Sequence, residues 1–362
     1  MDKDKLEAMD SKYVVTESRS SKNLKLSYSS GYVGIVISLI VALTIVISCN
    51  LISYKYLELF PTSRHGPETF SAAYGLFVSF NGVKSLDEPV NTIIIGNSTA
   101  GNNIFTGPVS DELGGATIKL SFSSHGSLLS YSWVLNYYFS KFSELDNVIF
   151  CVHCYGYEEE HDIEFMTAVP LPWGYWYKFN SPPAWKDGEK VDLFISKYIP
   201  LYSSSDILAY RLLHPSELFA PQRKRVPDKK YTGGNTAPSI DWSSIWRVRP
   251  PSNFGVFTPT ADSTTSLNNI CELADKYDFQ LYIVMQPEWD EGYSDPERQA
   301  KIEGQKKYLG QFTSDNVHIA LSNPVIFKAE EMQNWNHLRP DAAAYFTEAL
   351  LADIREINGT SD

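Results

Sequence analysis

The chain has 362 residues, of which 43% are hydrophobic, so it is long enough to bury one substantial core and to carry a further segment outside it. Its formal net charge of -12 argues against a nucleic-acid partner, because phosphate binding depends on clustered Lys and Arg. The short basic run 223–225, with Lys229 and Lys230, is the local exception, and it fits either a solvated loop or a contact with an anionic polymer.

A long apolar segment follows the amino-terminal tail. Residues 1–31 begin with a polar, Ser-rich stretch of mixed charge, and we expect a disordered tail there. Residues 32–54 carry no charge, and about twenty apolar residues are what a bilayer requires, so we expect a transmembrane anchor. A cleaved signal peptide is the alternative. The long tail before the segment and the lack of a clear small-x-small cleavage site after it favour the anchor.

The charges on the two flanks predict the orientation of this anchor in the lipid bilayer. Six basic residues precede the span and two follow it closely: Lys3, Lys5, Lys12, Arg19, Lys22 and Lys25 come before it, and Lys55 and Arg64 come after it. Basic residues accumulate on the cytoplasmic side of a membrane. We therefore expect a single-pass protein with a cytoplasmic amino end and a periplasmic or cell-surface domain.

After a juxtamembrane connector over 55–90, strand and helix patterns alternate. The expected strands are 92–95, 116–120, 147–152, 280–285 and 317–320, and the expected helices are 108–113, 128–142, 263–277, 295–312 and 340–357. Asp262 or Ser263 is the expected cap of the helix 263–277. Such alternation is typical of an α/β fold with a parallel sheet and crossover helices.

The alternation breaks between about 155 and 260, where Pro and Trp are frequent. A stretch this long inside a compact domain is usually functional or has structure of its own, so we interpret it as an insertion over the active edge. Its aromatic side chains fit two roles: the small core of the insertion, or stacking on sugar rings. The core is favoured because aromatic residues are first of all large apolar groups.

Four cysteines are too few for a disulfide scaffold. Cys49 lies in the apolar segment. Cys151 and Cys154 have a spacing that metal ligands use, but such ligands need partners elsewhere and Cys151 lies on an expected buried strand, so we expect neither a metal nor another cofactor. A bridge between Cys154 and Cys271 stays open for an oxidising compartment.

The first strand ends in a motif that predicts a reactive serine. The apolar run 92–95 is broken by Gly96, and Asn97, Ser98 and Thr99 follow at once. Ligands bind at the carboxyl edge of the strands in open α/β sheets, so Ser98 is a candidate nucleophile. The alternative is that these polar residues only cap the next helix or form a turn.

A second motif stands near the carboxyl terminus, where His337 comes just before the expected helix 340–357. A serine nucleophile needs a base, and imidazole is the side chain whose unperturbed pKa lies closest to neutrality. Ser98 and His337 are far apart in the sequence, and we expect them to meet at one edge of the sheet.

Three short motifs now stand together: Gly96-Asn97-Ser98 after a strand, the run Ser-Phe-Ser-Ser-His-Gly that ends at Gly126, and Asn334-x-x-His337 near the carboxyl terminus. Over about 92–357, the chain resembles the SGNH, or GDSL-like, hydrolase superfamily. It looks most like the membrane-anchored branch that works beside membrane-bound O-acyltransferases in alginate acetylation and teichoic-acid D-alanylation. This resemblance implies a three-layer, flavodoxin-like SGNH fold over 91–358, a membrane-bound O-acyltransferase-type acyl donor and a glycan polymer as acceptor.

The resemblance assigns roles to three residues. Ser98 matches the nucleophile that attacks an acyl carbonyl, and His337 matches the base that takes its proton. Asn334 stands where the family has an Asp that orients the histidine. A carboxylate fixes the tautomer and stabilises the imidazolium, whereas an amide does only the first, and only with its carbonyl oxygen toward the ring. The site is therefore slower, or served by another carboxylate, or no longer catalytic.

The resemblance also implies donors for the oxyanion of an acyl-transfer intermediate. The positions of Ser98 and Gly126 match two backbone donors of the family. The third donor of the family is an Asn after the third strand. Here His153 and Tyr155 follow that strand instead, and either is a candidate donor. The residues expected to line the pocket are Gly96, Asn97 (in place of the usual Asp), His125 and His153.

Two further observations bear on the setting of this site. Asn97-Ser98-Thr99 also reads as a glycosylation acceptor, and a glycan there would block the nucleophile, which favours a bacterial envelope. The remaining histidines, which are expected to be surface or structural groups, are His65, His161, His214 and His318.

Three functions remain open. The first is an acyltransferase that moves an acyl group, with acetyl expected, from Ser98 to a hydroxyl of a surface glycan. The second is an esterase that removes acyl groups at the same site. The third is a non-catalytic glycan-binding or assembly subunit. The intact pair of Ser98 and His337 places the first ahead, and Asn334 favours the third over the second.

Overall fold

The computed structural model describes residues 32–49, 90–121, 128–139, 145–159, 188, 191, 194–195, 199 and 255–359. The chain divides into two compact units, Met1–Leu59 and Phe60–Asp362, which are treated separately below. The expected tail 1–31, almost all of the connector 55–90 and most of the insertion 155–260 lie outside the described residues.

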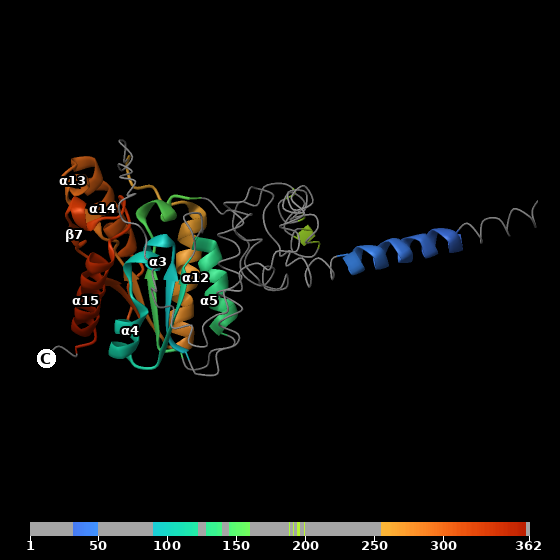
Figure 1. The fold of residues 1–362 in the computed structure, drawn as a ribbon, viewed down its shortest axis with the longest axis horizontal. Helices are drawn as coiled ribbons and strands as arrows, with labels where there is room; N and C mark the ends of the chain where they lie inside the picture. Colours follow the sequence, from blue (N-terminus) through green and yellow to red (C-terminus); the bar gives the residue numbers. More distant parts are fainter. Residues whose placement is uncertain are drawn as a thin grey trace, which may run out of the picture. The chain divides into compact units, whose positions relative to one another are not determined.

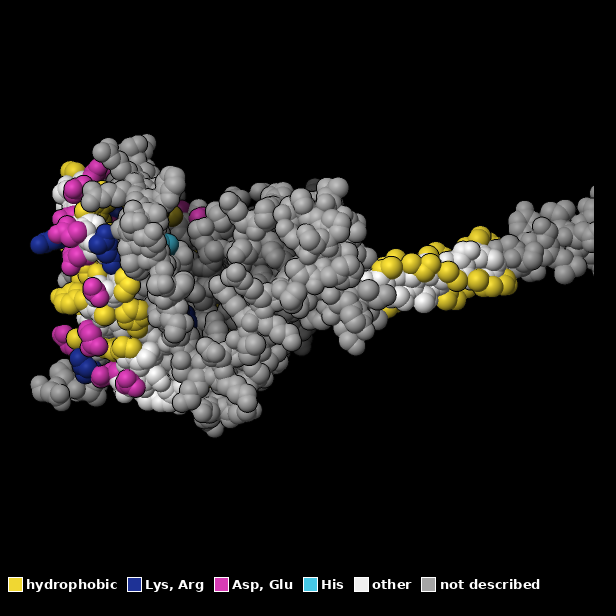
Figure 2. Space-filling view, viewed as in Figure 1, with side chains coloured by type: hydrophobic (Ala, Val, Ile, Leu, Met, Phe, Trp, Pro, Cys, Tyr) yellow, Lys and Arg dark blue, Asp and Glu magenta, His cyan; other side chains and the backbone are white. Residues whose placement is uncertain are grey.

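The first unit contains a helix over Tyr32–Cys49, with 18 residues and a mean hydropathy of 2.6. At about 1.5 Å per residue it is roughly as long as the hydrocarbon core of a bilayer is thick. Its large apolar side chains are exposed, as the space-filling view shows (Figure 2). The helix is thus long and apolar enough to cross a membrane. A signal sequence passes the same test, so the choice between anchor and signal peptide, like the orientation, stays a prediction.

The second unit is built on a five-stranded sheet in which every pairing is parallel (Figure 1). In spatial order its strands are β2 (Ala116–Ser121), β1 (Val90–Gly96), β3 (Asn147–Cys151), β4 (Gln280–Val284) and β6 (Val317–Ala320). The predicted α/β class with a parallel sheet is confirmed. From β1 the chain moves first to one side and then, through β3, to the other, so the strand order reverses between β1 and β3. Ligands bind at such a switch point in open α/β sheets.

Helices cover both faces of this sheet. On one face lie α5 (Leu128–Phe139), α12 (Ala261–Tyr277) and α14 (Pro296–Leu309), and on the other lie α3 (Ser98–Asn103), α4 (Thr106–Leu113) and α15 (Pro340–Ile357). In β1, Ile93 and Ile95 pack into the first core, while Ile94 between them packs into the second. Because side chains alternate along a strand, a strand covered on both faces must be apolar throughout.

The boundaries of the elements test the sequence expectations. The strand over 317–320 and the helix over 340–357 have the predicted limits. The prediction that Asp262 or Ser263 caps α12 is wrong: Thr260 is the N-cap, and its hydroxyl accepts a hydrogen bond from the Ser263 N–H at 3.1 Å. Helix α12 therefore begins two residues earlier than expected.

Several short elements were not predicted. Strands β5 (Glu288–Trp289) and β7 (Ile326–Phe327) form a small parallel sheet of their own. Short helical turns occupy α13 (Asp290–Tyr293), η1 (Cys154–Tyr157) and η3 (Ala329–Glu331). Elements of two to four residues carry too little periodicity for a pattern to reveal them.

Candidate active site

The site begins at Gly96, the last residue of β1. Gly96 pairs with Cys151 of β3, and a Cβ atom at Gly96 would lie 1.8 Å from the Cys151 carbonyl oxygen. Only glycine fits this close approach of two backbones. The strand therefore ends directly at the switch point, where the turn to α3 starts.

The sequence left two roles open for the residues after Gly96, a helix cap and a reactive serine. Asn97 takes the first, and Ser98 stays a candidate for the second. Asn97 is the N-cap of α3: its Oδ1 accepts from the Thr99 N–H at 3.0 Å, and its backbone oxygen accepts from the Gly101 N–H at 3.2 Å. Ser98 is the first residue of the helix and is half-buried. The capping interpretation thus holds for Asn97, and it leaves the Ser98 hydroxyl available.

His337 meets Ser98 as expected. The Ser98 Oγ lies 2.9 Å from the His337 Nε2, although the two residues are 239 positions apart. His337 lies in the loop before α15, and its backbone oxygen accepts from the Gln333 N–H at 2.7 Å. The two predicted catalytic side chains are therefore in hydrogen-bond contact, a distance suited to proton transfer.

Asn103, which sequence reasoning missed, connects the serine helix to the histidine loop. It is fully buried at the end of α3; its Oδ1 accepts from the Leu338 N–H at 2.9 Å, and its Nδ2 donates to the Asn336 backbone oxygen at 3.1 Å. These two contacts hold the backbone on either side of His337. No local pattern points to Asn103, because its partners lie more than 230 residues away.

Lys119 on β2 also supports the carboxyl end of α3 and was missed as well. Its Nζ donates to the backbone oxygen of Gly101 at 2.9 Å and to that of Ile104. A cation at the carboxyl end of a helix is favoured by the helix dipole, and these carbonyls have no partner within the helix. Burial lowers the pKa of Lys119 to about 8. Helix α3 is short, and this contact fixes its end.

Asn334 takes the orientation that does not favour a catalytic base. Its Oδ1 accepts from the backbone N–H groups of Asn336 at 3.1 Å and His337 at 2.9 Å. Because N–H groups only donate, these two bonds fix which end of the amide is oxygen. The Nδ2 then lies 2.9 Å from the His337 Nδ1 and donates to it. In the neutral ring the hydrogen consequently sits on Nε2 and points at Ser98.

The ionisation of His337 agrees with this arrangement. Burial lowers the pKa of His337 to about 4, so the ring is neutral at neutral pH. Within the described part of the chain, no carboxylate contacts the ring. The pair is thus held at the right distance, but in the tautomer that cannot accept the Ser98 proton until the ring hydrogen moves to Nδ1.

His153 follows β3, the strand next to β1, and is the N-cap of η1. Its Nδ1 accepts from the Tyr155 N–H at 3.2 Å, and its ring stacks on that of Tyr155 and meets the edge of Trp335 at a centroid distance of 4.5 Å. Burial, followed by the positive charge of Arg298, holds the pKa of His153 well below its usual value. The Tyr155 backbone N–H is thereby used within the protein, but the His153 Nε2 and the Tyr155 hydroxyl have no partner among the described residues, so both candidate donors stay available.

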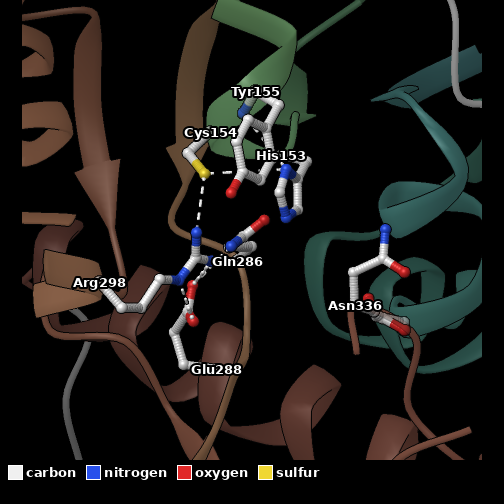
Figure 3. A network of polar contacts seen from close by, with 8 residues as sticks. His153, Cys154, Tyr155, Gln286, Glu288, Arg298 and Asn336 are labelled. Carbon is white, nitrogen blue, oxygen red and sulfur yellow. Dashed lines mark hydrogen bonds and ion pairs between the residues drawn. The ribbon is translucent and has the colours of Figure 1, made fainter. Parts of the chain in front are cut away.

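A charged network lies behind His153 (Figure 3). Arg298 forms a two-point ion pair with Glu288, with distances of 2.6 and 2.9 Å, and both side chains are buried. The Arg298 Nη1 also donates to the Cys154 Sγ at 3.1 Å. The bridge to Cys271 that the sequence left open is not formed, because both thiols are free. Burial raises the pKa of the Cys154 thiol to about 11.

The remaining candidates separate clearly. Gly126 and His125 lie outside the described residues. His318 is a satisfied structural group, as expected: its Nε2 lies 2.8 Å from the Gln280 Oε1, and its ring stacks on Tyr282. The structure therefore brings together Ser98, His337, Asn334, Gly96, Asn97, His153 and Tyr155 at the carboxyl edge of the sheet.

The chain was compared with protein-family models, with curated proteins and with solved structures, and none of the three comparisons finds a match.

Proposed function

We propose that the domain over 91–358 is an SGNH-like acyltransferase that forms an ester on Ser98 and passes the acyl group, acetyl in our proposal, to a hydroxyl of a cell-surface or exported polysaccharide. The observation that carries this proposal is the 2.9 Å contact between the Ser98 Oγ and the His337 Nε2. Its place, at the switch point of a parallel sheet, is where α/β proteins bind ligands.

The reaction has two steps. In the first, the Ser98 oxygen bonds to the acyl carbon of the donor, whose leaving group departs with the serine proton. In the second, a glycan oxygen bonds to the same carbon, the bond to Ser98 breaks, and the glycan proton returns to Ser98. His337 relays the proton within each step, first from Ser98 to the leaving group and then from the glycan hydroxyl to Ser98, and its ring is neutral between the steps. The Ser98 backbone N–H, which has no partner within the helix, supplies one oxyanion donor, and Gly126 is the second donor that the resemblance implies.

Asn334 sets the cost of this mechanism. For His337 to act as a base, its hydrogen must sit on Nδ1, which requires the Asn334 oxygen to face the ring. Turning the amide breaks two hydrogen bonds to backbone N–H groups, at roughly 0.5–1.5 kcal/mol each. The proposed transfer is therefore slow compared with that of a triad with a carboxylate.

The partners follow from the same proposal. The acyl donor is a membrane-bound O-acyltransferase-type protein, and the helix Tyr32–Cys49 keeps the domain beside it at the bilayer. A second candidate function, a glycan-binding or assembly subunit without turnover, is favoured by one specific observation, the amide nitrogen of Asn334 that faces His337.

The test is a search for the acyl-enzyme. The full chain in detergent is incubated with an activated acetyl ester, and intact mass and peptide mapping locate the adduct. We expect acetyl on Ser98, with no adduct in Ser98→Ala and a strongly reduced yield in His337→Gln. Ser322→Ala is the matched control, because Ser322 is half-buried past β6 on the same sheet edge and should acylate like the parent.

The products then separate the functions. Transfer of acetyl to an added sugar supports the acyltransferase, and release of acetate alone supports the esterase, in which water replaces the glycan. A folded chain without any adduct on Ser98 would overturn both and make the binding subunit the leading function.

A further inference from the structure

The Tyr155 hydroxyl is one buried polar atom at the site without a hydrogen-bond partner within the described part of the chain, and two more are the Nε2 of His153 and the Oε1 of Gln286. His153 and Gln286 are only 4% and 2% exposed. An unpaired buried polar group costs about 1–3 kcal/mol, so two of them at one sheet edge call for an explanation. They are not used by the Ser98–His337 pair.

The bonding character of each atom is fixed by its own side chain. The Nδ1 of His153 accepts from the Tyr155 N–H, so in the neutral ring the Nε2 carries the hydrogen and is a donor. The Nε2 of Gln286 donates to the carboxylate of Glu288, which Arg298 holds in place. The Oε1 of Gln286 is therefore an acceptor. One atom offers a hydrogen and the other requires one.

The register of the sheet places both residues at the same edge as Ser98. Gly96, Cys151 and Val284 are paired in one row across β1, β3 and β4, and the three strands end there. Ser98, His153 and Gln286 each come two residues after one of these strand ends. His153 therefore follows the strand next to β1, and Gln286 follows the strand beyond it.

Side-chain contacts aim the two groups into the same region. In Figure 3 the free nitrogen of His153 and the amide oxygen of Gln286 point toward one another, on the side of the network that faces Asn336. The His153 ring is held by Tyr155, which stacks on it at a centroid distance of 4.9 Å, and by Trp335, from the loop of His337. Trp335 thus links this region directly to the reacting pair.

We propose that His153 and Gln286 bind one hydroxyl group of the ligand, whose oxygen accepts from the His153 Nε2–H and whose hydrogen is donated to the Gln286 Oε1. An alcohol has both capacities in one atom. A carboxylate or phosphate dianion cannot donate to Gln286, and an ammonium group cannot accept from His153. The ligand class is therefore a neutral polyhydroxyl compound, such as the sugar units of a glycan. This assignment rests on the proposed function, for which it holds the acceptor at the same edge of the sheet as Ser98.

The experiment measures binding without catalysis, so that its failure and the failure of acyl transfer stay distinct. The full chain in detergent, carrying Ser98→Ala, is titrated with methyl glycosides of glucose, galactose, mannose and N-acetylglucosamine, and with ribitol, and binding is followed by ligand-observed NMR and calorimetry. We expect Gln286→Leu and His153→Phe each to raise the Kd about tenfold, the loss of roughly one net hydrogen bond.

Conservative variants keep the test independent of folding. His153→Gln keeps a donor and should stay within about threefold of the parent Kd, which a merely structural role would not predict. Gln286→Asn keeps both the acceptor and the amide donor to Glu288, and it should lose less affinity than Gln286→Leu. His318→Gln is the matched control, because this histidine is satisfied by Gln280 on another strand, and it should leave the Kd unchanged. Equal Kd values in Gln286→Leu, His153→Phe and the parent, or no binding by any probe of the series, would overturn the proposal.

Discussion

The two halves of the candidate site are built in opposite ways. On the β1 side, the side chains that hold Ser98 and His337 are amides with their bonds satisfied by backbone groups: Asn97 at the helix start, Asn103 between helix and loop, and Asn334 within the loop. On the β3–β4 side, an ion pair is buried, and His153 and Gln286 each keep one polar atom without a partner among the described residues.

The difference lies in where the polar side chains find their hydrogen-bond partners. The Ser98–His337 distance is set by contacts within the protein, so it does not depend on a substrate. In our proposal, the unpaired donor and acceptor on the other side are satisfied by a hydroxyl of the ligand. The proposed division of labour places the reacting atoms on the β1 side and recognition on the β3–β4 side.

The largest expected effect comes from placing a carboxylate beside His337, on the β1 side. In Asn334→Asp, a carboxylate accepts from the His337 Nδ1–H and leaves Nε2 free to take the Ser98 proton. We expect acylation of Ser98 by an activated ester to rise by roughly 10²–10⁴-fold, by comparison with the loss that the reverse change causes in serine proteases. Stopped-flow acylation kinetics measure this effect.

The pH profile sharpens the same test. The base is the neutral ring, so in the parent chain activity falls as the pH drops through the pKa of His337, which is about 4. The added carboxylate raises that pKa, and the acid limb should move to higher pH. Asn323→Asp, an exposed position in contact with Lys306, is the matched control. An unchanged rate in Asn334→Asp would mean that His337 is not a base, and would favour the binding subunit.

The next largest effect is expected from breaking the buried ion pair on the β3–β4 side. Glu288→Ala removes the carboxylate of a buried ion pair, and removing one partner of such a pair costs about 3–5 kcal/mol of unfolding free energy. Glu112→Ala is the control, because its pair with Arg355 is exposed and contributes at most about 1 kcal/mol. Urea unfolding of both variants measures the difference. Losses of similar size would show that the network does not stabilise this side.

The smallest expected effect concerns the pH dependence of stability. The pKa of His337 is about 4 in the fold and 6.5 in the reference state, so below pH 6.5 the unfolded chain binds a proton first. Stability is complete above pH 6.5 and falls toward pH 4, by up to about 3 kcal/mol from this residue, at about 1.4 kcal/mol per pH unit. His337→Gln should remove that part, leaving the contribution of His153, which has the same sign. Identical pH slopes in parent and variant would contradict the assignment.

Much of the fold could be predicted because its signals are local. The strand 317–320 and the helix 340–357 have sharp boundaries, and the run 92–95 is apolar throughout because both faces of β1 are buried. Helix α3 escaped prediction because Ser-Thr-Ala-Gly-Asn-Asn has weak helix formers, and its ends are fixed by Asn97 and by the distant Lys119.

The residues of the site likewise divide into those with a local sequence signal and those whose role depends on distant partners. Ser98 and His337 could be predicted, because each stands in a motif at the end of an element. The roles of Asn103 and Gln286 depend on partners brought close only by the sheet and its helices. Asn334 was recognised as a departure from an acid, but its orientation is decided by two backbone N–H groups, which no sequence pattern records.

The Asn103 side chain holds the backbone of the His337 loop, and this separates the position of the loop from the chemistry of its side chains. Its bonds go to the carbonyl of residue 336 and the amide of residue 338, never to the imidazole between them. These bonds to backbone groups fix the position of the loop at this edge of the sheet. They do not involve the side chains of residues 98 and 337. If the proposed chemistry is correct, an exchange at Asn334 changes the reactivity of Ser98 and leaves these backbone contacts in place.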